Sequence, residues 1–142
     1  MFDHERLAVY QLELQFIAWV SDLLDEVRAN KSPRVREVSD QLDRSSLSSL
    51  LNTAEGNAKC QPALRTRYFD DARGSGVESA ACLDALVAKR VITMERILPG
   101  KEMLLNIVRM LTGLCPVPLS DGIVREEPLI YGLGGGAESN GD

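Results

Sequence analysis

The chain has little of the chemistry from which most catalytic and metal sites are built. It contains one histidine, His4, and three cysteines, none of them in a CxxC pair. Without a second histidine, no Ser-His-Asp or Cys-His arrangement can form away from the N-terminus. The Glu-x-x-His pairs of helical dimetal proteins are absent too. We therefore expect no enzymatic activity, no cofactor and no metal ion.

Long apolar runs and a basic leader are also missing. No segment approaches the roughly 18 apolar residues of a membrane span, and the opening stretch, MFDHERLAVY, is acidic and amphipathic, unlike an export signal. The three scattered cysteines favour neither a disulfide framework nor a zinc knuckle and fit a reducing compartment. We expect a cytoplasmic protein without a membrane partner.

Positive charge is not in excess, because the formal net charge is −5 at pH 7. Most of this acidity comes from residues 114–142, which hold 1 basic and 5 acidic side chains and are rich in Pro and Gly. Residues 1–113 are nearly balanced, with 15 basic and 16 acidic side chains. We predict a helical domain over 1–113 and a mostly disordered tail over 114–142, with a candidate docking segment between Ile123 and Tyr131.

Apolar residues recur at helical spacing in four segments, 5–28, 33–55, 62–90 and 93–113, and no segment alternates as a strand does. We therefore predict an all-α fold. Ser32 and Pro33 are typical of a helix start, as is Pro62. Gly56 is the residue expected just beyond a helix end, and Pro99-Gly100 is expected to break or kink the last helix.

The first helix is apolar over more of its circumference than one face of a small bundle can cover. Only a narrow strip of it is polar, and a four-helix domain of this size has no central helix in which the rest could be buried. We therefore predict that the protein is a homo-oligomer. The candidate subunit interface is one of its two apolar stripes, formed by Leu12, Phe16, Trp19 and Leu23.

In the second and third predicted helices, small side chains stand at positions where an apolar stripe should continue. Small side chains allow two helices to approach closely, and buried Ser hydroxyls can bond to carbonyls of their own helix. We predict a close crossing of these helices and assign to it Gly74 and Gly76, each of which costs about 1 kcal/mol inside a helix. RGSG lacks the preceding strand and following Lys-Ser/Thr of a phosphate-binding loop. Glu55 and Glu78 are expected to pair with Arg44, Arg67 or Arg73 in a structural role.

Three motifs in order resemble one family. Residues 44–56, RSSLSSLLNTAEG, resemble the signature Arg-Ala-x-x-Ser-x-x-x-Asn-Ile-Ala-Glu-Gly of the 23S rRNA-intervening sequence proteins, with Thr53 in place of Ile. Residues 67–78, RYFDDARGSGVE, are similar to that family's Arg-Phe-x-x-x-Ala-x-Gly-Ser-x-x-Glu, and residues 2–11, FDHERLAVYQ, to its opening Phe-x-x-Leu-x-Val-Tyr-Gln. The matching positions are Arg44, Ser48, Asn52, Glu55, Gly56, Arg67, Gly74, Ser75 and Glu78.

The resemblance implies an antiparallel up-down four-helix bundle that assembles as a homopentamer. The family includes proteins encoded within rRNA intervening sequences. It also includes the accessory protein of diversity-generating retroelements, which binds reverse transcriptase and nucleic acid. The resemblance implies no catalytic role for the signature positions.

Two functions stay open at this point. The first is association with RNA or the ribosome through a modest basic zone over 28–73, where nine basic side chains face six acidic ones. Repetition of this zone around an oligomer would add avidity, and such binding would weaken with salt. The candidate contacts are Arg28, Lys31, Arg34, Arg36, Lys59, Arg65 and Arg67. The second function is that of a scaffold or accessory subunit with a protein partner and no nucleic-acid binding.

Overall fold

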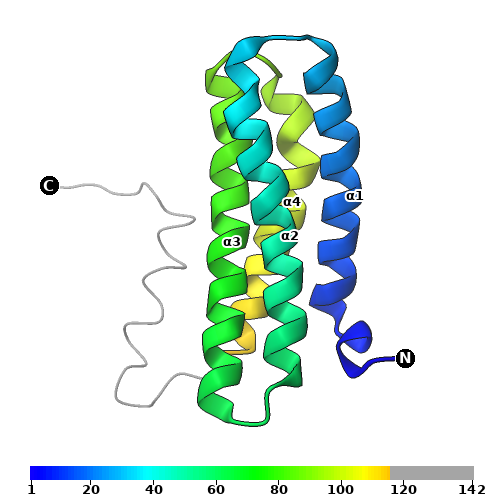
Figure 1. Cartoon of the computed structure of the whole chain (residues 1–142), viewed down its shortest axis with the longest axis vertical. Helices are drawn as coiled ribbons and strands as arrows, with labels where there is room; N and C mark the ends of the chain where they lie inside the picture. The colour runs from blue at the N-terminus through cyan, green and yellow to red at the C-terminus, as the bar shows by residue number, and fades with distance from the viewer. Residues whose placement is uncertain (116–142) are drawn as a thin grey trace, which may run out of the picture.

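The computed structural model describes residues 1–115, and within them it contains four α-helices and no strand (Figure 1). The predicted all-α fold is confirmed. The tail from residue 116 onward lies outside the described residues. In chain order the elements are η1 (Asp3–Arg6), α1 (Ala8–Ala29), η2 (Pro33–Val35), α2 (Arg36–Ala58), α3 (Pro62–Ala88) and α4 (Met94–Gly113). Within residues 1–115, no helix is both long enough and apolar enough for a membrane crossing.

The helices begin where the local signals predict. The Ser32 hydroxyl accepts a hydrogen bond of 3.4 Å from the Arg34 backbone N–H, and Pro33 opens the short η2 turn that leads into α2. Pro62 is the first residue of α3. Thr93 caps α4 by accepting a 3.2 Å bond from the Arg96 backbone N–H. The side-chain oxygens of Ser32 and Thr93 thereby satisfy backbone donors that have no partner within the helix.

The four helices pack around one core, in which α1 contacts α2 and α4, and α3 contacts α2 and α4 (Figure 1). Every helix contributes large apolar side chains to this core. Full burial of each such side chain contributes roughly 1.5 to 3 kcal/mol. The largest fully buried apolar residues are Phe16, Phe69, Leu23, Leu24, Leu42, Leu83, Leu86, Ile97, Ile107 and Leu111.

Gly56 does not end its helix, because α2 continues to Ala58. The predicted role of Gly56 beyond the helix end was therefore wrong. Its Cα faces α3 so closely that an added Cβ would lie 2.9 Å from the Phe69 ring and 3.0 Å from Tyr68 Cβ. Gly56 is thus the residue that lets the start of α3 approach the end of α2.

The other helical glycines also differ from expectation. Around Gly74 an added Cβ would meet nothing within 4 Å, and at Gly76 it would meet Val108 of α4 at 3.4 Å. Neither glycine serves the crossing of α2 and α3, so that assignment was wrong. α4 runs unbroken through Pro99, and a Cβ at Gly100 would overlap the Trp19 ring. Gly100 therefore makes room for an α1 side chain.

The stripe predicted to be the subunit interface faces largely into the chain's own core. Phe16 and Leu23 are 2% and 0% exposed, while Leu12 and Trp19 are partly buried against the same core. The interface prediction was therefore wrong for Phe16 and Leu23, because a side chain already covered by its own chain has no surface for a second copy. The apolar surface that α1 leaves open lies on its other stripe, at Leu14.

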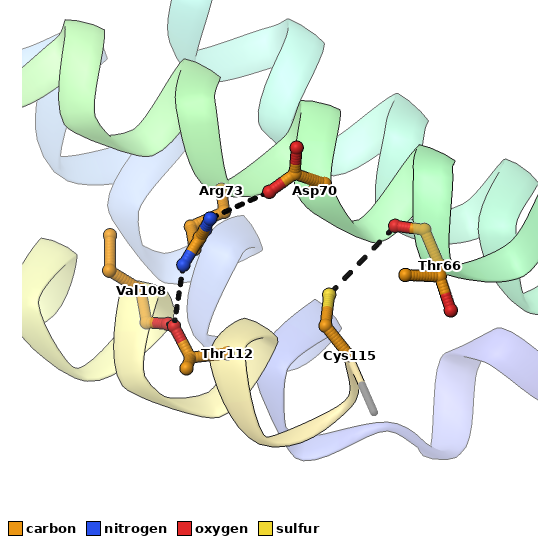
Figure 2. A network of polar contacts seen from close by, with 6 residues as sticks. All are labelled: Thr66, Asp70, Arg73, Val108, Thr112 and Cys115. Carbon is orange, nitrogen blue, oxygen red and sulfur yellow. Dashed lines mark hydrogen bonds and ion pairs between the residues drawn. The ribbon is translucent and has the colours of Figure 1, made fainter. Parts of the chain in front are cut away.

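Polar contacts hold the end of α4 against α3 (Figure 2). The Arg73 guanidinium donates to Asp70 Oδ1 at 2.7 Å and to Thr112 Oγ1 at 3.4 Å. Farther along, the Cys115 thiol lies 3.8 Å from the Thr66 carbonyl oxygen. The last described residue is thereby placed beside the first turns of α3.

Candidate functional site

α2 carries two rows of small polar side chains, and the row facing α3 joins the two helices. Ser45 Oγ and Ser79 Oγ lie 2.7 Å apart, and Ser75 Oγ donates to Ser48 Oγ at 3.0 Å. The Ser79 hydroxyl also lies 3.0 Å from the Ser75 carbonyl of its own helix. Such short hydroxyl contacts require the helix axes to be close, so the predicted close crossing of α2 and α3 is confirmed.

Five signature positions gather along this row, namely Arg44, Ser48, Asn52, Ser75 and Glu78. Gln41 links two of them. Its amide nitrogen donates to the Glu78 carboxylate, and its amide oxygen accepts a 2.6 Å bond from the Arg44 guanidinium. Glu78 and Arg44 therefore interact through an amide, and within residues 1–115 Glu78 forms no direct ion pair with Arg44, Arg67 or Arg73, the three predicted partners. The motif holds two helices together.

The remaining signature positions lie elsewhere. Glu55 pairs with Lys59 at 3.9 Å on the surface of α2, and the Lys59 ammonium lies 5.1 Å from the centre of the Tyr68 ring. The predicted pairing of Glu55 with an arginine was therefore wrong. Arg67 and Gly74 are exposed on α3. Most signature positions thus pack helices together, while Glu55, Arg67 and Gly74 lie on the surface.

The basic zone divides between opposite ends of the bundle (Figure 1). Arg28, Lys31, Arg34 and Arg36 lie where α1 joins α2, whereas Lys59, Arg65 and Arg67 lie where α2 joins α3. The two groups are separated by α2, whose 23 residues span about 34 Å at 1.5 Å per residue. The seven candidate contacts therefore do not form one surface.

Several of these cations already have partners within the chain. Arg28 lies 3.6 Å from Asp40. Arg65 donates to the backbone carbonyl of Asn57 at 2.9 Å and stands over the Phe69 ring at 5.4 Å. Arg65 therefore caps the end of α2, where backbone carbonyls have no helical partner.

Glu13 is the polar group that the sequence analysis missed. It is 1% exposed, and its Oε2 accepts hydrogen bonds from Ser49 Oγ at 2.7 Å and Thr53 Oγ1 at 2.8 Å. Its other oxygen, Oε1, is buried without a hydrogen-bond partner in the described residues. Burial raises the pKa of Glu13 to about 7, although the two hydroxyl bonds act in the opposite direction. Glu13 therefore exchanges a proton near neutral pH.

A signal for Glu13 does exist in the sequence. The buried row of α1 begins Val9, Glu13, Phe16, Val20, with the alternating steps of four and three that define one helix face. A carboxylate within such a row is a buried ionisable group. Glu13 lies between the two apolar stripes of this helix and belongs to neither of them, so the stripes alone did not predict its burial.

Two apolar faces stay exposed on the bundle, and both combine neighbouring helices. The α1/α2 face consists of Leu14, Ile17, Leu47 and Leu51, of which Leu47 and Leu51 are 48% and 54% exposed. The α3/α4 face consists of Val77, Met94, Leu98 and Leu105, all exposed. A groove of about 330 Å³ opens on the α1/α2 face, lined by Ile17, Asp40, Asp43, Arg44, Ser46 and Leu47.

Within residues 1–115, no group of three or more His, Cys, Asp or Glu side chains is arranged to hold a metal ion. His4 makes ring contacts with Phe2 at 5.7 Å and Tyr10 at 4.7 Å in and around η1. The candidate features of residues 1–115 are therefore the α2 serines that face α3, the buried Glu13 with Ser49 and Thr53, and the two apolar faces.

A family model described as "23S rRNA-intervening sequence protein" matches residues 5–113. The chain is also similar to a crystal structure from Bacteroides thetaiotaomicron, described as a protein with unknown function from the S23 ribosomal protein family. The two share 21% sequence identity and a TM-score of 0.71, and the match covers 78% of this chain and 100% of the other. This likeness shows a shared fold. No curated protein matches the chain.

Proposed function

The chain belongs to the 23S rRNA-intervening sequence protein family, and from its surface we propose that it is a non-enzymatic protein that acts as a ring of identical subunits. The observation that carries this proposal is the pair of exposed apolar faces, α1/α2 and α3/α4, on one small domain. Groups of exposed apolar side chains can mark interaction sites. The ring is the scaffold on which a partner is held.

The placement of the two faces favours a head-to-tail contact. α1 and α2 are neighbours, as are α3 and α4, so the two faces lie on different sides of the bundle. A two-fold dimer would cover one face twice and leave the other open, whereas a head-to-tail contact covers both and forms a ring when the rotation between neighbouring copies closes. The family resemblance supports five copies.

An antiparallel up-down order is part of this proposal, and side-chain pairs support it. Arg28 near the end of α1 lies beside Asp40 near the start of α2. Glu13 in the first half of α1 bonds to Thr53 in the second half of α2. Likewise, Lys101 in α4 donates at 2.5 Å to Asp84 late in α3.

Native mass spectrometry tests the ring. The wild-type protein should have five times the 15.6 kDa mass of one chain. The double variant Leu47→Glu, Leu51→Glu places charge on the α1/α2 face and should be monomeric. Leu64→Glu is the matched control, because Leu64 is exposed but outside both faces. A monomeric wild-type protein would refute the proposal.

RNA association is a second candidate, and one arrangement favours it. The loops that join α1 to α2 and α3 to α4 lie at the same end of the bundle (Figure 1). Exposed cations gather there, and among the described residues they have no ion pair: Lys31, Arg34, Arg36, Lys89 and Arg90. A ring would repeat this end in every copy and add avidity.

Charge-reversal variants test whether RNA binds at the end of the bundle where α1 joins α2 or at the opposite end. Lys31→Glu, Arg34→Glu, Arg36→Glu should abolish retention of labelled single-stranded RNA at low salt, because phosphate contacts dominate such binding. Arg67→Glu, at the opposite end, should leave retention unchanged. If the triple variant retains RNA as well as wild type does, this end is not an RNA surface. The ring would then serve a protein partner alone.

A further inference from the structure

We propose that Glu13 is a proton-operated latch between α1 and α2. With its carboxyl group neutral, residues 8–16 are held on α2. When the group ionises, this first half of α1 opens locally while the rest of the bundle stays folded. The proposal concerns the single chain and does not depend on ring formation.

The geometry suits the neutral acid better than the carboxylate. Apart from Glu13, every buried residue of α1 is apolar. A buried carboxylate is costly unless it is paired or fully hydrogen-bonded. Glu13 has two hydroxyl donors on Oε2, from Ser49 and Thr53, and none on Oε1. The charged form is therefore short of donors inside the core.

No charge from a neighbouring element compensates. Burial raises the pKa of Glu13 and the two hydroxyl bonds lower it, and no charged side chain is among the causes of the shift. Charged residues that the surrounding elements carry in this half of the bundle are not buried. They include Asp3 of η1, Glu55 and Lys59 of α2, Asp70 and Arg73 of α3 and Arg109 of α4. Ionisation of Glu13 thus leaves an unpaired charge in the core.

The second half of α1 has more buried apolar side chains than the first, namely Val20, Leu23, Leu24 and Val27, and it also has more contacts with neighbouring helices. Glu26 accepts a 2.6 Å bond from Arg96, Arg28 pairs with Asp40, and the Trp19 ring sits against Gly100. The first half has Val9 and Phe16 in the core.

Before α1 begins, η1 adds an exposed 3.0 Å bond from Asn57 to Asp3. Local opening of one segment costs less than global unfolding. The penalty of ionisation is therefore expected to be relieved at residues 8–16.

Hydrogen exchange of the full chain tests the latch at pH 5 and pH 8.5, with rates corrected for the intrinsic effect of pH. Glu13 should have the ordinary Glu pKa of 4.5 when the segment is open and the raised pKa of about 7 when it is closed. The opening constant of residues 8–16 should therefore rise roughly 70-fold between these pH values. Residues 20–28 are the internal control and should change far less.

Three variants separate the latch from other causes. Glu13→Gln keeps the shape of the neutral acid but cannot ionise, so the pH dependence at residues 8–16 should disappear. Glu102→Gln, on the surface of α4, should behave as wild type does. Thr53→Val removes a donor to the ionised form and should move the midpoint of opening to higher pH, which provides a test should Glu13→Gln fold poorly.

Two results would overturn the proposal. One is unchanged protection of residues 8–16 in the wild-type protein between pH 5 and pH 8.5. The other is an equal rise at residues 8–16 and 20–28, which would mean that the bundle opens as a whole.

Discussion

At the scale of single residues, Glu13 makes the stability of the bundle depend on pH. Its pKa is about 7 in the folded chain and 4.5 in the unfolded one, so the folded state binds more protons between these values. Stability contributed by the neutral acid is therefore complete below pH 4.5 and is lost as the pH rises through 7. The full effect is about 3 kcal/mol.

We expect the free energy of unfolding in urea to fall by up to about 3 kcal/mol between pH 5 and pH 8.5 because of this residue. The difference between wild type and Glu13→Gln isolates it, since all other groups titrate equally in both proteins. The variant should be the more stable protein at pH 8.5. A difference that is the same at both pH values would mean that Glu13 does not titrate in this range.

Two glycines in regular helix offer a matched comparison. Gly56→Ala places a methyl group against the Phe69 ring and Tyr68, and overpacking of this kind should destabilise the bundle by about 1 to 3 kcal/mol. Gly74→Ala meets nothing within 4 Å and should stabilise it by about 0.5 to 1 kcal/mol through helix propensity. Urea unfolding of both variants measures the two effects. Similar shifts of the same sign would contradict the close approach at Gly56.

At the scale of elements, the bundle consists of one close helix pair and a first helix docked by different means. α2 and α3 meet through serine hydroxyls at Ser45–Ser79 and Ser48–Ser75. α1 is instead docked on α4 by an aromatic ring at Gly100. Arg96 adds to that contact, because its guanidinium stands 5.4 Å from the Trp19 ring centre and also bonds to Glu26.

Gly100→Ala should disturb this docking. The added methyl group would overlap the Trp19 ring, so the indole must move outward at a cost of about 1 to 3 kcal/mol. Because Trp19 is the single tryptophan of the chain, its fluorescence emission reports the change and should shift to longer wavelength. Gly113→Ala, where an added Cβ meets nothing within 4 Å, is the control. Unchanged emission in the Gly100 variant would argue against the observed contact.

At the scale of the whole molecule, exposed apolar side chains matter more than surface charge. The ion pairs among residues 1–115 have at least one side chain more than half exposed, and exposed pairs contribute about 0 to 1 kcal/mol. The α1/α2 and α3/α4 faces, in contrast, lie open in a single chain. Covering them in an assembly would therefore add stability that the monomer lacks.

This coverage makes the melting temperature depend on protein concentration. Assembly stabilises the folded state by mass action, so dilution should lower the Tm of the wild-type protein. The Leu47→Glu, Leu51→Glu variant should melt at one temperature whatever its concentration. Calorimetry over a hundredfold dilution series measures both. A wild-type Tm that does not depend on concentration would mean that the two apolar faces are not covered by assembly.

The sequence by itself determined the helical class, the starts of the helices and the close crossing of α2 and α3. These follow from local causes: apolar periodicity, caps such as Ser32 and Pro62 at a helix start, and the small side chains around Ser45 and Ser79. The family motif is readable for the same reason, since five of its positions lie along the contact of α2 and α3. Each of these signals acts within a few helical turns.

The tertiary structure alone decided which stripe of α1 faces the core, because α1 is apolar on several sides and only its neighbours determine what they cover. It also placed Gly56 and Gly100, whose need for space comes from Phe69 and Trp19 on other helices. It separated cations that are close in sequence, because α2 carries them to opposite ends of the bundle. Glu13, finally, has a pKa near neutrality only because the surrounding helices exclude water from it.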